Sequence, residues 1–333
     1  MNVTVIVCTY NRCRTLATAL DSVAASAMHD SVAWEVLVVD NNSKDDTRGV
    51  VKQYSDKFPG RFRYIREERQ GKSYALNTGI REAKGDILAF LDDDVTVEPA
   101  WLPNLTAPVL SGEWVGAGGR IRASEISGLP DWMVLEGPYG LGGVLCGLFD
   151  CGEVPRELQL DTAPNGSNMA YHRRIFEKYG LFRTDMGPSI DNTTPHPNED
   201  TEFGRRLMLA GERLFYVPDA IIYHPVLQER LRKDYFLSWW FDYGRAVILE
   251  KRRRPPILGI PRKFFSISDL VVRYLLTRTL RWCLTLDKRR RFYNKCQVWS
   301  TAGAIVQTYR QPSEPPLRSG QMAQKPVKNI THG

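Results

Sequence analysis

Short apolar runs alternate with segments of helical periodicity along the first part of the chain. Runs of strand length stand at residues 3–8, 34–39, 62–65 and 87–91. Between them, apolar side chains recur every three or four positions, as expected of helices that bury one face. This alternation predicts an α/β domain with a mostly parallel sheet and right-handed crossovers, a nucleotide-binding type of architecture.

The pattern is more varied beyond residue 98. It predicts helices at 99–110, 173–179, 199–209 and 235–250, and strands at 114–121, 168–171, 214–217 and 220–223. Residues 122–165 show no clear period. They include the glycine-rich segment Gly137–Gly143, but no predicted strand precedes it and Pro138 lies inside it. A phosphate-binding loop needs a strand–turn–helix context, so we expect a loop that borders a substrate pocket.

The carboxyl third differs from the rest of the chain in charge. Residues 1–227 contain 23 Lys and Arg against 31 Asp and Glu, whereas residues 228–333 contain 22 against 7. Apolar side chains between Phe264 and Leu286 fall on one face of a predicted helix, and four basic residues follow at 288–291. Such a segment is either an interfacial membrane helix or a helix packed on the catalytic body. The polar, proline-bearing residues 311–333 predict a disordered tail.

The chain has no sequence signal for secretion or for crossing a membrane. Met1–Val7 lacks the basic region and long apolar core of a signal peptide, and no uncharged run reaches the ~18 residues of a membrane span. The six cysteines form no CxxC pair, which is typical of reduced, structural thiols. We therefore expect a cytoplasmic protein, peripheral at the inner face of the plasma membrane, with anionic lipid rather than nucleic acid as the partner of its basic third.

Three consecutive carboxylates, Asp92, Asp93 and Asp94, stand at the end of the fourth predicted strand. Like charges at this spacing repel one another unless water, a cation or basic groups compensate them. Ligands of open α/β sheets bind at the carboxyl ends of the strands, which suggests a metal-bound ligand that contains phosphate. The alternative is a solvated acidic turn with an aspartate capping the next helix. Asp40 and the pair Glu199–Asp200 occupy comparable positions at another strand end and at a helix start.

Four segments, taken together, carry a family resemblance. They are Val5–Arg12, Val38–Ser43, Phe90–Asp94 and Asn198–Leu207. In this order they resemble motifs of the family 2 glycosyltransferases, enzymes of the GT-A fold, over about residues 1–225. The resemblance implies a catalytic domain at 1–227, with a nucleotide-sugar-binding half at 1–121 and an acceptor-binding half at 122–227. Residues 228–310 would then be a basic helical extension.

The resemblance implies a nucleotide-sugar donor, most readily a UDP-sugar. The residues that match the family's donor site are Thr9, Tyr10, Asn11, Asp40, Asn42, Lys72, Asp92 and Asp93. Tyr10 offers an aromatic face to the base, Asp40 an acceptor for a base N–H, and Lys72 a positive charge near the phosphates. Each also has a structural explanation: a half-buried strand-end tyrosine, an Asx-turn at Asp40, and a solvated lysine at a helix end.

Divalent metal binding follows from the same resemblance. Asp94 matches the family's DxD motif and is the first candidate ligand, with Asp92 and His224 as further ligands. Oxygen ligands favour Mn²⁺ or Mg²⁺, and such a cation would stabilise the departing nucleoside diphosphate. His224 could equally be an ordinary loop histidine.

The catalytic base implied by the resemblance is Asp200. It would take the proton of the acceptor hydroxyl in a single displacement that inverts the anomeric carbon. Gly166, Asn168 and Glu199 match the segments that line the donor-sugar and acceptor site. The acidic residues at 199–202 also favour a helix amino terminus, whether or not they have a second role.

One difference from the family's sequence motifs narrows the range of reactions expected of this chain. Processive polysaccharide synthases carry a Gln-x-x-Arg-Trp motif after the base, where this chain has Arg205–Leu209. We therefore expect transfer of one sugar to a lipid-linked or surface-glycan acceptor. Two alternatives remain. A nucleotidyltransferase would need a basic glycine-rich loop where this chain has Thr9–Arg12, and a non-catalytic protein would bind nucleotide sugar or nucleic acid.

Overall fold

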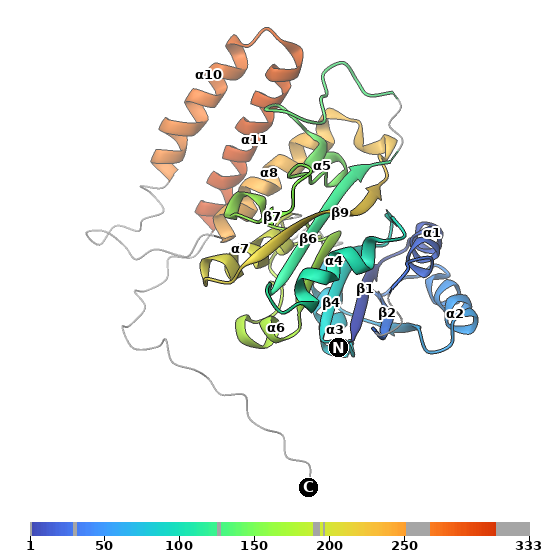
Figure 1. The fold of residues 1–333 in the computed structure, drawn as a ribbon. Helices are drawn as coiled ribbons and strands as arrows, with labels where there is room; N and C mark the ends of the chain where they lie inside the picture. The colour runs from blue at the N-terminus through green and yellow to red at the C-terminus, as the bar shows by residue number, and fades with distance from the viewer. Residues whose placement is uncertain are drawn as a thin grey trace.

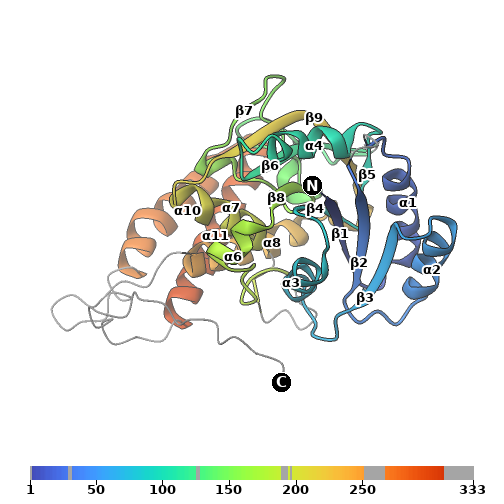
Figure 2. The same ribbon diagram turned by 60° about the horizontal axis from the view of Figure 1, so that its bottom comes forward.

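The computed structural model describes residues 2–28, 32–124, 128–188, 194–195, 197–250 and 267–310. In this part of the chain, one nine-stranded sheet lies between two layers of helices (Figures 1 and 2). The strands are β1 (Val3–Thr9), β2 (Trp34–Asp40), β3 (Phe62–Arg66), β4 (Ile87–Asp92), β5 (Thr96–Val97), β6 (Gly116–Ala123), β7 (Arg156–Glu157), β8 (Asn168–His172) and β9 (Leu214–His224). Their order is β3-β2-β1-β4-β8-β6-β9-β5, and β7 pairs with β9.

The amino-terminal half is the predicted parallel sheet. β1 lies between β2 and β4, β2 also pairs with β3, and all three pairings are parallel. Helices α1 (Cys13–Ala24), α2 (Thr47–Lys57) and α4 (Trp101–Leu110) contribute to the core on one face, and α3 (Lys72–Glu82), α6 (Arg174–Tyr179) and α7 (Glu199–Leu209) to the core on the other. Because both faces are covered, these strands are apolar almost throughout rather than alternating.

The second half of the sheet is mixed, with antiparallel pairings beside the parallel pair of β6 and β9. β8 runs antiparallel to both β4 and β6, and β5 and β7 run antiparallel to β9. The two strands predicted at 214–217 and 220–223 form the single strand β9. The register between β6 and β9 shifts beside Gly119, so a bulge accommodates Pro218 and Asp219 without ending the strand.

The carboxyl third adds a layer of helices. α8 (Lys233–Glu250) packs along α11 (Lys288–Arg310), and α10 (Leu276–Leu284) continues the π-helical turn η3 (Leu270–Leu275) and packs on α11 (Figure 1). Shorter elements are α5 (Gly142–Cys146), η1 (Leu160–Thr162) and η2 (Gln228–Arg230). The predicted amphipathic segment therefore packs on the protein through one face. Its start at 264–266 and the predicted tail at 311–333 lie outside the described residues. None of the helices described here has the length and apolar character needed to span a bilayer.

Two glycines allow α8 and α11 to approach closely. A Cβ atom on Gly303 of α11 would lie 1.9 Å from the carbonyl oxygen of Phe241, and one on Gly244 of α8 would lie 1.8 Å from that of Ser300. Backbone atoms cannot move aside as a flexible side chain can. The contact between the two helices therefore depends on the absence of a side chain at both positions.

We expect Gly303→Ala to lower the free energy of unfolding by roughly 1–3 kcal/mol, because α8 and α11 must separate to admit the methyl group. This loss would outweigh the better helix propensity of alanine. Thermal unfolding measures it. The matched control is Gly143→Ala, where a new Cβ would have no atom closer than 3.8 Å. An unfolding temperature of Gly303→Ala at or above that of the wild type would contradict the packing argument.

Candidate active site

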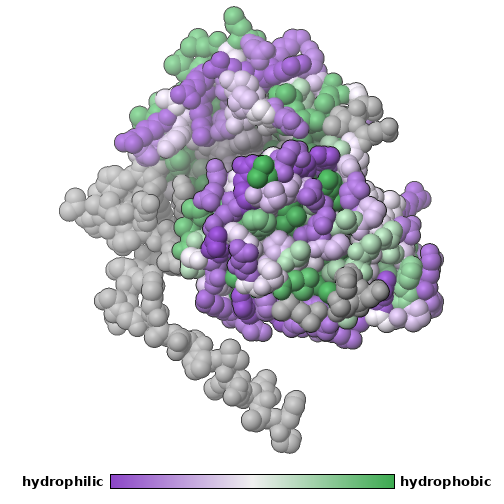
Figure 3. All heavy atoms as spheres, viewed as in Figure 1, coloured by the Kyte–Doolittle hydropathy of each residue, from purple (hydrophilic) through white to green (hydrophobic). Residues whose placement is uncertain are grey.

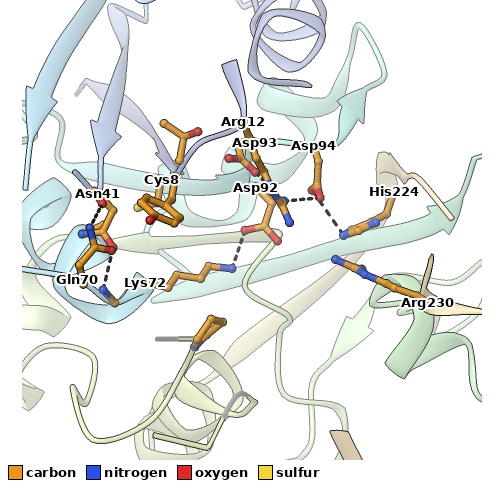
Figure 4. Close-up of a pocket in the computed structure, with 15 residues that line it drawn as sticks. Cys8, Arg12, Asn41, Gln70, Lys72, Asp92, Asp93, Asp94, His224 and Arg230 are labelled. Atoms are coloured by element: carbon orange, nitrogen blue, oxygen red, sulfur yellow. Dashed lines mark hydrogen bonds and ion pairs between the residues drawn. The ribbon is translucent and has the colours of Figure 1, made fainter. Parts of the chain in front are cut away.

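The candidate site is a cavity of about 340 Å³ at the carboxyl ends of β1, β2 and β4 (Figure 4). These strands end beside one another because they are parallel and in register, Thr9 beside Asp40 and Cys8 beside Asp92. The cavity is lined by Cys8, Thr9, Tyr10, Arg12, Asn41, Gln70, Gly71, Lys72, Ala75, Asp92, Asp93, Asp94, Pro188, His224 and Arg230. Its size falls within the usual range for small-molecule sites.

Asp92, Asp94 and His224 form a group that could hold a metal ion. One ligand atom from each lies within 4.8 Å of the others, and His224 Nε2 is 3.7 Å from Asp94 Oδ1. Asp94 Oδ1 is buried and has no hydrogen-bond partner among the described residues. His224 Nδ1 lies 3.1 Å from the carbonyl oxygen of Pro225, and donation to that oxygen would leave Nε2 free as a ligand. A buried acceptor without a partner beside a carboxylate and an imidazole fits a divalent cation.

Basic groups neutralise part of the negative charge at the end of β4. Arg12 Nη1 lies 3.1 Å from Asp93 Oδ1 and 2.6 Å from Asp94 Oδ2. Lys72 Nζ lies 2.6 Å from Asp92 Oδ1. Burial raises the pKa of Asp93 to about 6, although Arg12 opposes this shift. The pKa of Lys72 is raised because neighbouring carboxylates, Asp92 first, outweigh the cost of burying its charge. Two cations thus face three carboxylates.

The opposite end of the cavity is built by backbone and amide groups (Figure 4). Asn41 accepts a hydrogen bond from the Gly71 N–H at 2.8 Å and donates to the carbonyl oxygen of Arg69 at 2.6 Å. Gln70 donates to the carbonyl oxygen of Asn41 at 2.9 Å. This network fixes the segment before α3 against the end of β2. It makes this end of the cavity rigid. Gln70 Oε1 is buried without a hydrogen-bond partner among the described residues, so one acceptor remains here for a bound group. Tyr10 also lines the cavity.

Three residues predicted to bind the nucleotide-sugar donor do not line the cavity. Their side chains form hydrogen bonds within the loops. Asp40 is buried and accepts hydrogen bonds from the Ser43 N–H at 2.8 Å and the Tyr64 hydroxyl at 2.7 Å, a local turn like the one considered as its alternative role. Asn11 accepts from the Lys44 N–H at 2.7 Å, and Asn42 accepts from Arg66. Both asparagines adopt positive φ angles, 51° and 67°. They shape the loops that carry the site.

Glu199 and Asp200 form the first turn of α7, as expected for acidic residues at a helix start. Asp200 Oδ2 accepts a hydrogen bond from the Gly166 N–H at 2.5 Å, and Oδ1 accepts from the Thr201 N–H at 2.6 Å. A Cβ atom on Gly166 would lie 2.8 Å from Asp200 Oδ2, so glycine is needed for this approach. Glu199 is buried, and this burial together with the charge of Asp200 raises its pKa to about 8. The charge of Asp200 favours protonated Lys72.

Asn168 does not face the cavity, contrary to the prediction that it contacts donor sugar or acceptor. It is fully buried, accepts a hydrogen bond from the Trp101 indole N–H at 2.8 Å, and donates to the carbonyl oxygens of Arg120 and Ala220. Since both the oxygen and the nitrogen of its amide are used within the protein, Asn168 holds β8, α4 and the β6–β9 bulge together.

Sequence reasoning missed several cavity residues. Arg12 belongs to the Thr9–Arg12 segment that suggested the family, so its position was a usable signal. Arg230 had no such signal, because it stands in the short η2 turn after His224. Its Nη1 donates to the carbonyl oxygen of Leu145 at 3.1 Å, and its guanidinium lies near His224 at the end of the cavity away from Asn41 (Figure 4). Only the fold brings Leu145 and Arg230 together.

Comparison with known proteins assigns the family. The model of glycosyl transferase family 2 matches residues 4–180, more than half of the chain. The chain belongs to glycosyl transferase family 2. This membership supports glycosyl transfer and disfavours both the nucleotidyltransferase and the non-catalytic alternatives.

Two relatives of this family 2 member are named for a glycosyl transfer and for the biosynthesis of a polysaccharide. It is 28% identical over 255 residues to the glucosyl-dolichyl phosphate glucuronosyltransferase of Haloferax volcanii, covering 74% of this chain and 77% of that protein. It is 26% identical over 251 residues to the succinoglycan biosynthesis protein ExoM of Rhizobium meliloti, covering 74% of each.

Solved structures show the same GT-A fold. A mannosyltransferase of Pyrobaculum calidifontis in complex with GDP-Man and Mn²⁺ aligns with a TM-score of 0.58 at 19% identity, over 91% of this chain and 86% of that one. S. aureus TarS residues 1–349 in complex with UDP-GlcNAc align with a TM-score of 0.54 at 17% identity, over 93% and 92%. The predicted GT-A fold is confirmed.

We expect Asp94→Asn to weaken Mn²⁺ binding at least about tenfold, because it replaces a charged ligand oxygen by a neutral amide. Calorimetric titration of the protein with Mn²⁺ in the presence of UDP measures this loss. The control is Asp56→Asn, which removes a carboxylate that is 65% exposed and pairs with Lys52. Equal Mn²⁺ affinity in Asp94→Asn and the wild type would exclude Asp94 as a ligand.

The raised pKa of Glu199 predicts a pH-dependent stability. Between pH 4.5, the ordinary pKa of a glutamate, and a pH of about 8, Glu199 keeps a proton in the folded protein that it releases in the unfolded chain. The free energy of unfolding of the metal-free protein should therefore fall as pH rises from about 5 to about 8, by up to about 1.4 kcal/mol per pH unit from this residue. We expect Glu199→Gln to flatten that slope in urea unfolding, whereas Glu229→Gln, at an exposed position, leaves it in place. An unchanged slope in Glu199→Gln would show that this carboxyl is ionised in the folded state.

Proposed function

We propose that this chain is an inverting glycosyltransferase that moves one sugar from a nucleotide-sugar donor to a lipid-linked or surface-glycan acceptor. The observation that carries the proposal is the Asp92–Asp94–His224 group at one end of a cavity whose other end is formed by Asn41 and Gln70 (Figure 4), with Tyr10 also in its lining. A nucleoside diphosphate has matching chemistry, with a planar base at one end and two phosphates at the other. UDP is our preferred nucleotide.

Asp92, Asp94 and His224 would hold a divalent cation, Mn²⁺ or Mg²⁺, which supplies Lewis-acid stabilisation of negative charge on the phosphates. Lys72 orients Asp92 through their 2.6 Å ion pair and adds a positive charge beside the same group. Arg12 holds Asp93 and Asp94 in place from the loop after β1. Arg230 adds a guanidinium at the edge of the cavity, where it would favour an anionic substrate group.

Asp200 would act as the general base. The Gly166 and Thr201 N–H groups hold one oxygen each and fix the orientation of the carboxylate. In the proposed reaction, Asp200 takes the proton of the acceptor hydroxyl while the hydroxyl oxygen forms a bond to the anomeric carbon. The bond from that carbon to the phosphate oxygen breaks, and its electron pair leaves with the nucleoside diphosphate. Attack opposite the leaving group inverts the anomeric centre. Glu199, beside the base, would contact the sugar or the acceptor.

The acceptor is proposed from the relatives and from the basic extension. One relative's name specifies glucosyl-dolichyl phosphate and another succinoglycan biosynthesis, so a lipid-linked glycan fits both the family and the basic carboxyl third. We assign residues 1–227 to catalysis and 228–310 to association with the inner face of the plasma membrane.

We expect Asp200→Asn to lower turnover by about 10²–10⁴-fold, the usual contribution of a general base. Donor affinity should stay within a few-fold, because Asp200 is not among the residues that line the cavity proposed for the nucleotide. Release of UDP from a UDP-sugar in the presence of acceptor measures turnover, and thermal stabilisation by UDP with Mn²⁺ measures binding. The control is Asp219→Asn, at an exposed position of β9. Full turnover in Asp200→Asn would exclude it as the base.

A further inference from the structure

Exposed apolar side chains are concentrated on one short segment. The large apolar residues that are exposed in the described chain number eleven, and six of them lie between residues 272 and 286. They are Val272, Tyr274, Leu276, Leu280, Leu284 and Leu286. Single exposed apolar residues are normal on protein surfaces, but a contiguous group marks an interaction site.

Four of these residues form a stripe along η3 and α10. Val272, Leu276, Leu280 and Leu284 follow one another at intervals of four, so they lie along one side of the helix. They are 61%, 58%, 59% and 70% exposed. Figure 3 shows hydrophobic residues at the top of the molecule, where Figure 1 places the end of α10. We call these four residues the α10 stripe.

The other side of α10 is fixed to α11. The rings of Trp282 and Trp299 meet edge to face with centroids 6.2 Å apart. Arg278 donates to the carbonyl oxygen of Gln297 at 3.1 Å and to the Thr301 hydroxyl at 2.8 Å. These contacts prevent the helix from rotating to bury its leucines, so the α10 stripe stays directed outward.

Positive charge surrounds the stripe. Arg273 and Arg281 stand next to stripe residues on the helix, and Lys288–Arg291 follow at the turn into α11. Acidic groups in this region are engaged: Asp269 pairs with Arg273 at 2.7 Å, and Asp287 accepts from the Arg290 N–H at 2.8 Å. An apolar stripe with basic flanks fits an anionic bilayer surface, which takes up apolar side chains and attracts the cations. A second copy of this chain fits less well, because two such stripes face to face would bring Arg281 and its neighbours against like charges.

The segment is also joined to the region around the cavity. At the start of α11, Lys288 Nζ lies 2.7 Å from Asp131 Oδ2, and the Phe292 ring packs on Trp132 with centroids 4.5 Å apart. Trp132, Phe236 and Leu145 belong to the same apolar cluster as Phe292, and the Leu145 carbonyl holds Arg230 at the cavity. A lipid bound near α10 would therefore lie on the Arg230 side of the protein rather than on the Asn41 side.

From these observations we infer that the α10 stripe is a membrane-docking surface that enters the headgroup region of an anionic bilayer without crossing it. The inference deepens the proposed function, since it gives a lipid-linked acceptor a place to be presented. Docking itself requires neither donor nor turnover, so it can be tested independently.

The test measures binding of the full chain to vesicles by sedimentation, without donor or acceptor. The double variant Leu276→Gln/Leu280→Gln should bind vesicles of phosphatidylglycerol and phosphatidylcholine at least about tenfold more weakly than the wild type. It removes two exposed leucines that would enter the bilayer on docking. Arg281→Gln should weaken binding to these vesicles about fivefold and leave the weak binding to pure phosphatidylcholine unchanged. The matched control Val154→Gln/Leu209→Gln removes two apolar residues that are 67% and 74% exposed elsewhere, and should bind as the wild type does.

Two outcomes would overturn the inference. One is wild-type binding by Leu276→Gln/Leu280→Gln with an unchanged unfolding temperature. The other is that the wild type is a dimer, this variant is a monomer, and both bind vesicles equally well. That result would assign the stripe to a contact with a second copy of the chain. Asp200→Asn should dock as the wild type does. If sugar transfer is never detected but vesicle binding still depends on the stripe, the proposed function fails and the docking surface stands.

Discussion

The structure of the site depends on basic groups that compensate the repulsion among three adjacent carboxylates at the end of β4. Arg12, from the loop after β1, and Lys72, from the start of α3, lie against them. The end of β4, the loop after β1 and the start of α3 come from separate parts of the chain. The parallel register of β1 and β4 and the packing of α3 must therefore be correct before the charges can meet. These two basic groups leave Asp94 Oδ1 without a hydrogen-bond partner among the described residues, which leaves a buried oxygen for a divalent ion beside His224.

The parallel half of the fold was predictable because its information is local. β1, β2 and β4 consist mainly of apolar residues, β3 is a shorter mixed run, and each intervening helix repeats its apolar residues at helical spacing. The order of the acidic segments then indicated the family, and the strand ends placed Asp92 and Asp94 at the cavity. His224 could be proposed only by resemblance, since nothing near it in the sequence distinguishes a ligand from a loop histidine.

The remaining features depend on contacts between distant segments. Asn168 matched a substrate-site motif, yet its amide joins Trp101 to the backbone of Arg120 and Ala220, which no spacing rule connects. Pro218 and Asp219 indicate a break in the strand, but β9 bulges there and its pairing with β6 resumes at Ile221. Arg230 is positioned by a carbonyl group 85 residues earlier. In each case a partner distant in the sequence decides the role of the residue.

The glycine contact between α8 and α11 has a geometric consequence. Helices that touch backbone to backbone at Gly244 and Gly303 have little freedom to slide or tilt, and α10 is in turn fastened to α11. The carboxyl-terminal helices therefore form one packed unit, which the ion pair of Glu250 with Arg205 at 3.0 Å joins to the helix that carries Asp200. If α10 rests on a bilayer and Asp200 is the base, every lipid-linked acceptor would meet that carboxylate at one height above the lipid. Selection among acceptors would then depend on the number of sugars between the lipid and the reacting hydroxyl, in addition to the identity of the last sugar.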